Sequence, residues 1–194
     1  MIDRVRTSFA AQLSATAGCL QDFAHPEFHV HDPHAEREGS GPCYIVTTGM
    51  LAKADLHVRN AGRHAVHFIA IDQCLYDNAN PSKCDCALVS GDKIYFIEFK
   101  NSENQGDATI LKANTNPGDC LSQLAASIRD FYDRRIITPG QTVYAYASVG
   151  YPRSRPQNGA HHSDQLASLQ QKIQQGGART IRLRYCSESE LDIK

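Results

Sequence analysis

Residues 84–100 read CDCALVSGDKIYFIEFK, and this stretch decides the fold. Two apolar runs flank Gly91-Asp92, and a Gly-X pair between such runs is typical of a two-residue β-hairpin. Residues at equal distances from that turn face one another across the hairpin, which places Asp85 opposite Glu98. The sequence therefore predicts an antiparallel hairpin with two carboxylates at its open end.

Three charged side chains meet at this open end. Side chains directly opposed in an antiparallel pair lie roughly 5 Å apart at Cβ. Residues i and i+2 of a strand share a face, so Lys100 lies on the same side as Glu98. Two carboxylates this close repel each other unless one is protonated or a cation lies between them. Asp85, Glu98 and Lys100 therefore predict a site for a divalent metal; the alternative is a surface hairpin with charges at its end.

This arrangement resembles the motif of the PD-(D/E)xK nuclease superfamily, an Asp on one strand followed by an acid-x-Lys triplet at the end of the next. Asp85 matches the first acid, Glu98 the second and Lys100 the lysine, while Cys84 replaces the usual Pro. Residues 94–99 are apolar on both faces apart from the acid, which is typical of a central strand. The resemblance implies an Mg²⁺-dependent endonuclease, a phosphodiester hydrolase.

The resemblance also implies roles for individual residues. Mg²⁺ or Mn²⁺ would act as Lewis acid and lower the pKa of a bound water. Asp85, Glu98 and the carbonyl of Phe99 would be its ligands, and Lys100 would orient or help deprotonate the attacking water. Gln123, on the helix that follows, either contacts the water or a phosphate, or is a solvated helix position.

A further acid is the least defined part of this site. Many members of the superfamily supply one from the first helix, yet residues 2–23 contain no Glu. Glu36 and Glu38 in the following loop are candidate substitutes. Asp72, at the end of a predicted strand, is either an extra acid at the cluster's edge or a turn residue. One-metal and two-metal sites both stay open.

The order of elements along the chain predicts an α/β fold, a mixed β-sheet flanked by helices. Apolar residues recur at spacings of three and four from residue 2 to residue 20, which indicates an amphipathic first helix. The other predicted elements are strands at 43–48, 56–58, 64–71 and the hairpin, a helix beginning at 119, a strand at 143–149, a helix beginning at 164 and a strand at 181–185. The central order is that of a restriction-endonuclease-like αβββαβ core. We expect one domain, 1–194, with its core at about 2–149 and a C-terminal helix-strand addition at 150–194.

Composition limits the class of protein. The 194 residues are 41% hydrophobic and 21% charged, as in ordinary globular proteins. No apolar run approaches the roughly 18 residues that span a bilayer, so no membrane partner is expected. Seven cysteines form an odd count without framework spacing, which predicts reduced thiols in the cytoplasm. A net charge of −1 neither favours nor excludes nucleic acid as a partner.

Other chemistries have weaker support. Four histidines crowd the segment 25–34, but their spacing matches no standard zinc finger. Cys84 and Cys86 alternate with Asp85 and are expected to be small buried hydrophobes. The chain has neither a Gly-x-Ser-x-Gly elbow nor a Gly-rich phosphate loop, which gives serine-hydrolase and NTPase functions no basis.

Two functional classes follow from the sequence. The first is a metal-dependent nuclease in bacterial defence, restriction or repair, acting on DNA or RNA as a homodimer or with a partner protein. The second is a non-catalytic binding, immunity or regulatory module that retains a nuclease-like fold.

Overall fold

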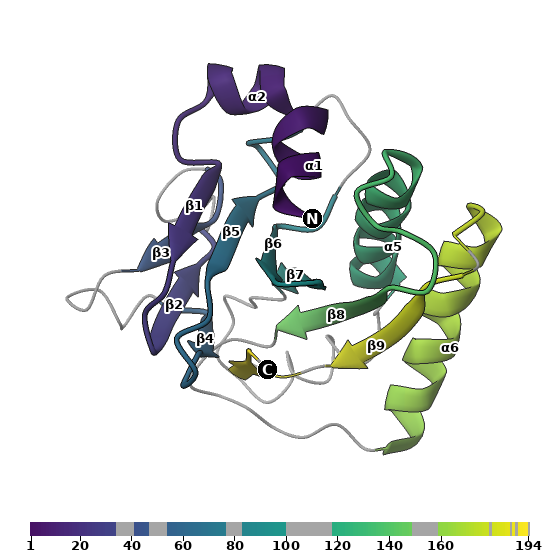
Figure 1. Cartoon of the computed structure of the whole chain (residues 1–194). Coiled ribbons are helices and arrows are strands. Elements are labelled where there is room, and N and C mark those ends of the chain that lie inside the picture. The colour runs from purple at the N-terminus through teal and green to yellow at the C-terminus, as the bar shows by residue number, and fades with distance from the viewer. Residues whose placement is uncertain are drawn as a thin grey trace.

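Two mixed β-sheets flanked by helices make up the computed structural model of the chain (Figure 1). The structure describes residues 1–33, 41–46, 54–76, 83–99, 118–148, 159–178, 180–186, 188 and 190–193. None of the helices in these ranges is long and apolar enough to cross a membrane. Lys100, Glu36, Glu38 and His34 of the predictions above lie outside the described residues.

The larger sheet has six strands in the described part of the chain. In spatial order they are β1 (Leu20–Phe23), β5 (Val66–Ala70), β6 (Cys86–Ser90), β7 (Lys93–Phe99), β8 (Thr142–Ser148) and β9 (Arg182–Cys186). The pairs from β1 to β7 are antiparallel, whereas β8 and β9 join in parallel. Parallel neighbours need crossover connections. Here they contain α5 (Gly118–Asp133) and α6 (Gly159–Gln175), which lie side by side against β7 and β9 (Figure 1).

The smaller sheet has four short strands. In spatial order they are β10 (Glu190–Asp192), β4 (Leu56–Arg59), β2 (Glu27–His31) and β3 (Tyr44–Val46). One face is apolar and joins the common core through Phe28, Val30, Leu56 and Val58, each at most 5% exposed. Because side chains alternate along a strand, the opposite face carries the histidines of β2 and β4.

The predicted hairpin is confirmed in its register. Ala87 pairs with Phe96 and Ser90 with Lys93, so the loop consists of the two residues expected. Gly91 has φ +59°, a left-handed conformation that glycine adopts without steric cost. The last paired residues before the open end are Cys86 and Ile97, and one further step sets Asp85 opposite Glu98.

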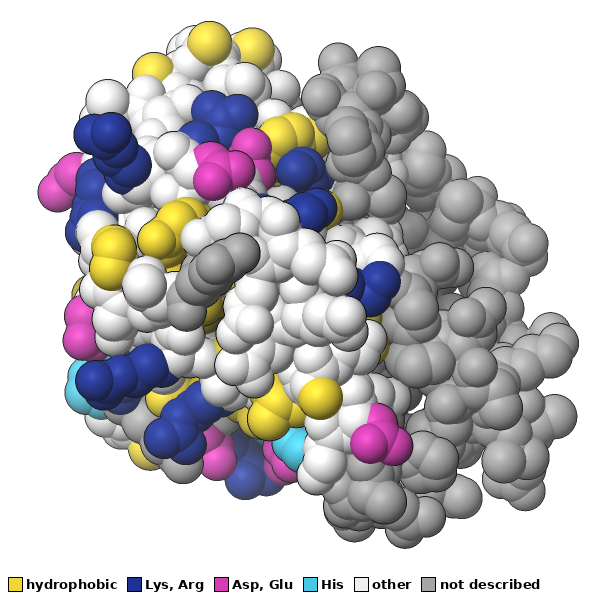
Figure 2. All heavy atoms as spheres, turned by 90° about the vertical axis from the view of Figure 1, so that its right-hand side faces the viewer, with side chains coloured by type: hydrophobic (Ala, Val, Ile, Leu, Met, Phe, Trp, Pro, Cys, Tyr) yellow, Lys and Arg dark blue, Asp and Glu magenta, His cyan; other side chains and the backbone are white. Residues whose placement is uncertain are grey.

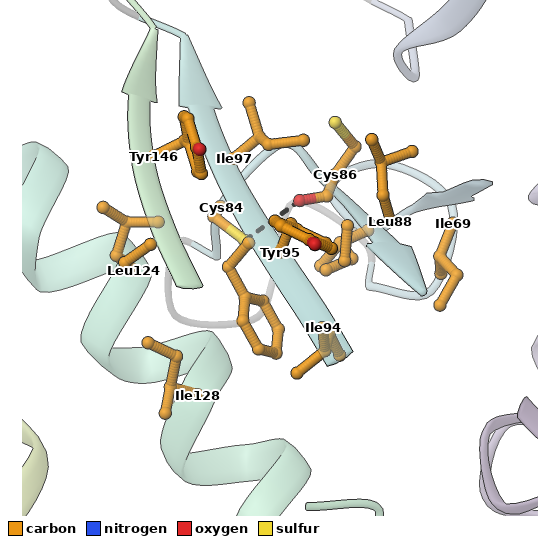
Figure 3. Close-up of a cluster of buried hydrophobic side chains, with 14 of the residues drawn as sticks. Ile69, Cys84, Cys86, Leu88, Ile94, Tyr95, Ile97, Leu124, Ile128 and Tyr146 are labelled. Carbon is orange, nitrogen blue, oxygen red and sulfur yellow. Dashed lines mark hydrogen bonds between the residues drawn. The ribbon is translucent and has the colours of Figure 1, made fainter. Parts of the chain in front are cut away.

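The core lies around this hairpin, and β7 is its central strand. Residues 94–99 are all buried, as predicted from their apolar character. Phe96 meets Phe131 of α5 edge to face, with ring centroids 5.1 Å apart. Tyr95 stacks on Tyr144 of β8 at 4.6 Å. Figure 3 shows the surrounding cluster, in which both Cys84 and Cys86 are fully buried, as the sequence suggested.

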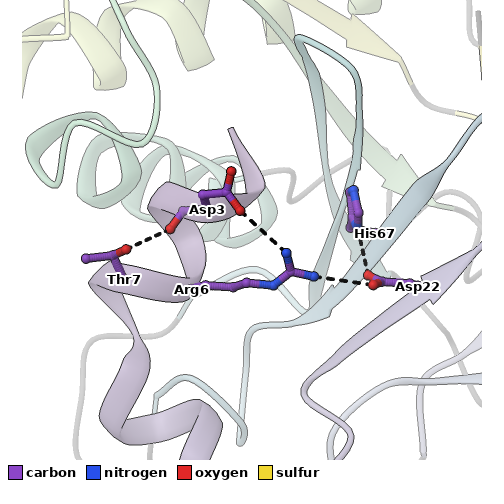
Figure 4. A network of polar contacts seen from close by, with 5 residues as sticks. All are labelled: Asp3, Arg6, Thr7, Asp22 and His67. Atoms are coloured by element: carbon purple, nitrogen blue, oxygen red, sulfur yellow. Dashed lines mark hydrogen bonds and ion pairs between the residues drawn. The ribbon is translucent and has the colours of Figure 1, made fainter.

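The predicted first helix is wrong in its extent. Two short helices, α1 (Ile2–Ser8) and α2 (Ala10–Ala15), replace one long helix, and Phe9 between them has the non-helical φ, ψ of −120°, 25°. The chain then turns at Gly18, with φ +88°, and enters β1. Arg6 of α1 contacts Asp22 of β1, whose carboxylate also binds His67 of β5 (Figure 4). Pairing with β5 thus overrides the helical periodicity of residues 16–20.

Two further predictions need correction. Residues 27–31 form β2, a strand that is absent from the predicted elements. Cys19 and Cys74 form a disulfide, with Cα atoms 5.6 Å apart, because β1 pairs with β5 and brings the two ends together. The argument for the cytoplasm from seven reduced thiols therefore fails for this pair, and the location stays a prediction.

The C-terminal segment is part of both sheets. The expected helix and strand are present as α6 and β9, and β9 extends the larger sheet beside β8. β10, which the sequence did not indicate, runs parallel to β4 and carries the fully buried Leu191. Residues 150–194 therefore include elements that both sheets require.

Candidate metal centre

The ends of strands from both sheets meet at one place. Asp32 directly follows β2, and Cys43 directly precedes β3. Asp85 directly precedes β6 of the larger sheet. The buried Ser148 hydroxyl, at the end of β8, donates a 3.0 Å hydrogen bond to the carbonyl of Asp55, which directly precedes β4. This bond ties the two sheets together where the acids lie.

Asp32, Cys43 and Asp85 form a group with the spacing of metal ligands. One carboxylate oxygen of each Asp and the Cys43 sulfur all lie within 4.8 Å of one another. The Cys43 thiol donates to Asp32 Oδ1 at 3.5 Å. Cys43 is 4% exposed, whereas both acids are partly exposed. The group therefore combines a buried sulfur with two acidic residues that are each only partly exposed.

Asp85 is the most strongly perturbed acid of this group. Burial raises its pKa well above the usual value, and the charges of Glu98 and then Asp32 raise it further. The backbone N–H of Phe99 donates to Asp85 Oδ2 at 2.6 Å, which opposes the rise. Glu98 is 2% exposed and lies outside the three-ligand group, yet its charge raises the pKa of Asp85 more than any other charge does. The structure thus brings Asp85 and Glu98 together as electrostatic neighbours.

Backbone contacts hold the segment that carries Asp85. Its carbonyl accepts the N–H of Ile71 at 2.9 Å and that of Asp72 at 3.3 Å. The N–H of Cys84 donates to Ser127 Oγ on α5 at 2.8 Å. Side-chain and backbone bonds from three elements therefore fix the position of this acid.

Asp55 positions the other acid. Its Oδ2 atom accepts the N–H of Asp32 at 2.9 Å and lies 2.6 Å from Nδ1 of His31. Asp55 and His31 are 8% and 3% exposed. A buried carboxylate that binds both a ring nitrogen and the backbone N–H of Asp32 fixes the backbone at the end of β2, from which the Asp32 side chain extends.

The other predicted site residues are placed as follows. Gln123 lies on α5 and its amide donates to the carbonyl of Lys83 at 3.4 Å, close in sequence to Asp85. Asp72 lies in a turn beside the Asp85 backbone, outside the three-ligand group, and burial raises its pKa. The N–H of Phe99 binds Asp85, and its carbonyl as a metal ligand stays a prediction. Lys100 lies outside the described residues.

The surroundings of Cys43 favour its neutral, protonated thiol. Burial raises the pKa of its thiol well above the usual value, and a hydrogen bond with Cys86 and the charges of Asp85 and Asp32 add to this effect. A divalent ion bound at the group would lower the pKa values of the Cys43 thiol and of both carboxyls, since it favours the ionised forms of sulfur and carboxylates alike. Binding of a cation would therefore require Cys43 to lose its proton.

Sequence reasoning missed Asp32, Cys43 and Asp55. They lie far from the hairpin in the sequence. Pairing within the smaller sheet brings them together, and the packing of the two sheets brings Asp32 and Cys43 to Asp85. The available signal was the alternation of Phe28 and Val30 with polar residues, which is typical of a half-buried strand that ends just before Asp32.

Comparison with known proteins adds no relative. No family model, no curated protein and no solved structure matches the chain.

Proposed function

We propose that this protein is a metal-dependent nuclease that hydrolyses phosphodiester bonds of nucleic acid. The observation that carries the proposal is the position of Asp85 next to the charges of both Glu98 and Asp32. Neighbouring negative charges disfavour ionisation of the Asp85 carboxyl, and a divalent cation relieves the repulsion. The same cation supplies the two requirements of phosphodiester hydrolysis, an activated water and stabilisation of charge on phosphate oxygens.

The order of elements supports the resemblance to PD-(D/E)xK nucleases. The antiparallel strands β5, β6 and β7 are followed by α5 and then by the parallel strand β8. This matches the βββαβ part of the expected core, although the four strands β1 to β4 lie between the N-terminal helices and β5. Asp85 precedes the second of these three strands, and Glu98 lies near the end of the third.

Each predicted residue has a role in this proposal. Asp85 and Glu98 provide carboxylates for Mg²⁺ or Mn²⁺, with the Phe99 carbonyl as a third ligand. Lys100 directly follows the residue whose N–H binds Asp85, which favours a role beside the metal-bound water. Gln123 supports the Lys83 backbone from α5 or contacts a phosphate.

The charge distribution indicates how nucleic acid would be bound. The net charge is −1, and on the face drawn in Figure 2 basic and acidic side chains of the described residues are interspersed. Affinity for phosphates would then come from a local group of basic residues and from the metal, rather than from a broad basic surface. Defence, restriction and repair all remain suitable roles, for a homodimer or with a partner protein.

A cleavage assay tests the proposal. Mixed DNA and RNA substrates are incubated with Mg²⁺ or Mn²⁺ and with wild type, Asp85→Asn, Glu98→Gln or Lys100→Ala, with EDTA as the metal-free control. Asp92→Asn is the matched control, since Asp92 is an exposed acid at the closed end of the same hairpin. We expect cleavage that needs metal, survives Asp92→Asn and is lost in the three site variants.

The same assay separates the alternative function. Absence of cleavage by well-folded protein on every substrate would favour a non-catalytic binding, immunity or regulatory module with a nuclease-like fold. Cleavage that persists in Asp85→Asn would contradict the assignment of the site.

A further inference from the structure

We infer that the cation at Asp85 is also bound by the Cys43 sulfur and by Asp32, so that the site selects a thiophilic divalent ion such as Zn²⁺ over Mg²⁺. The inference deepens the proposed function and shares with it the assumption of a metal at Asp85. It changes the ligand set, because Cys43 and Asp32 take the places of Glu98 and the Phe99 carbonyl beside Asp85.

The distances fit such an ion. Zn–S bonds of about 2.3 Å and Zn–O bonds of about 2.0 Å at a tetrahedral angle set the S and O ligands about 3.5 Å apart. The Cys43 sulfur and Asp32 Oδ1 lie 3.5 Å apart. All three ligand atoms, including one oxygen of Asp85, lie within 4.8 Å of one another. Small side-chain rotations would therefore complete the coordination without movement of the strands.

The ligands are held before any ion arrives. Asp55 binds the backbone N–H of Asp32, and the Phe99 N–H binds Oδ2 of Asp85. The Cys43 sulfur is buried and lies against Cys86. Ordering three side chains at the moment of binding would cost free energy, and the existing contacts reduce that cost.

The chemistry of the ligands selects the ion. Mg²⁺ takes oxygen ligands at near-octahedral geometry and binds thiolates poorly, whereas thiolates favour softer ions. A thiolate with two carboxylates makes three protein ligands, the number typical of catalytic zinc sites, where water or substrate takes the fourth position. Cys43 would lose its proton to solvent on binding. Asp32 and Asp85 are both partly exposed, and water would take the fourth position.

Cadmium titration tests the inference directly. EDTA-stripped full-length protein is titrated with Cd²⁺, and the ultraviolet absorption band from thiolate-to-Cd²⁺ charge transfer is recorded. The partly exposed thiol Cys186 is first replaced by Ser in every sample. We expect the band to saturate at one equivalent, to persist in the matched control Cys120→Ser and to vanish in Cys43→Ser. Cys120 is also a buried cysteine outside the disulfide, but it lies outside the group.

Calorimetry with Zn²⁺ gives the size of the effect. Changes in residues that merely orient a ligand typically lower metal affinity 10- to 100-fold, so loss of the Cys43 ligand should lower it by about 100-fold or more. Cys43→Asp should lose the Cd²⁺ band and gain affinity for Mn²⁺ and Mg²⁺, since it restores an all-oxygen set. Asp32→Asn gives a second variant in case Cys43→Ser fails to fold, and should lower Zn²⁺ affinity while retaining part of the band.

The outcomes separate this inference from the proposed nuclease. A folded wild type without the band, or a band unchanged in Cys43→Ser, overturns the inference. If either of these results is found together with Mg²⁺-dependent cleavage that persists in Cys43→Ser, the proposed nuclease function is retained. A Cys43-dependent band in a protein that cleaves neither DNA nor RNA would support the metal site and refute the nuclease.

Discussion

Asp85→Asn should stabilise the metal-free protein and abolish its stabilisation by metal. In the folded state burial and the charges of Glu98 and Asp32 raise the pKa of Asp85. The folded protein then binds more protons than the unfolded chain above pH 3.8, so wild-type stability falls as pH rises through that value toward the folded pKa. Asn does not titrate, and the variant should lack this loss at neutral pH.

Asp85→Ala separates charge from hydrogen bonding. Asn retains an oxygen that can accept the Phe99 N–H, whereas Ala leaves that buried donor without its 2.6 Å partner. Loss of a partner for a buried donor costs about 1–3 kcal/mol. For a chain of this length each kcal/mol corresponds to about 2–4 °C in Tm. We therefore expect Asp85→Ala to melt about 2–12 °C below Asp85→Asn in EDTA.

Metal should reverse the order of the Tm values of wild type and Asp85→Asn. A ligand present at 100 times its Kd stabilises the folded state by about 2.7 kcal/mol, or about 5–11 °C here. Thermal melts followed by circular dichroism, with EDTA and then with Zn²⁺ or Mn²⁺, measure all three proteins. The reasoning is refuted if Asp85→Asn melts below wild type in EDTA, or if metal raises the Tm of both proteins equally.

Three further predictions concern other parts of the chain. Replacing both Cys19 and Cys74 by Ser should lower the free energy of unfolding by about 4 kcal/mol, because the disulfide closes a loop across a separation of 55 residues. Urea titration of wild type should show a similar loss when reductant is added. No change with reductant would mean that the two thiols are not paired. Ser127→Ala removes the acceptor of the buried Cys84 N–H and should cost about 1–3 kcal/mol in urea unfolding and also weaken metal binding, because that segment carries the first acid of the motif; unchanged metal affinity would contradict the positioning role. Burial, and then the charge of His57, lower the pKa of His29. The free energy of unfolding should therefore be highest above pH 6.5 and should fall as the pH drops below that value. Tm measured between pH 7.5 and pH 5 should show a smaller fall in His29→Gln than in wild type.

The hairpin could be predicted because its determinants are local. Gly91 fixes the turn, and the alternation beyond it fixes the register, so the opposition of Asp85 and Glu98 follows by counting. The same reasoning identified α5, β8 and β9 to within a few residues, since each has a strong apolar period. These elements contain the acid pair but not the rest of the candidate site.

Long-range pairing explains what the sequence did not reveal. Leu20 fits the helical period of residues 2–20 but pairs with Ile69 in a sheet, because burial beside β5 outweighs a weak local preference. Strand β2 is masked by its histidines, although Phe28 and Val30 alternate with them as in a half-buried strand. Its end fixes Asp32, so an error in assigning β2 is also an error in the ligand set.

The smaller sheet is what makes the candidate centre more than a pair of acids. The hairpin alone provides Asp85 and Glu98, two repelling carboxylates that any hard cation would satisfy. β2 and β3 add an acid and a buried thiol at the same point, and Asp55 from the start of β4 orients the acid. β10 extends that sheet beside β4. If the sulfur binds the ion, metal selectivity resides in the smaller sheet and the hydrolytic residues in the larger one. Substitutions in the two sheets should then alter different properties of the same centre.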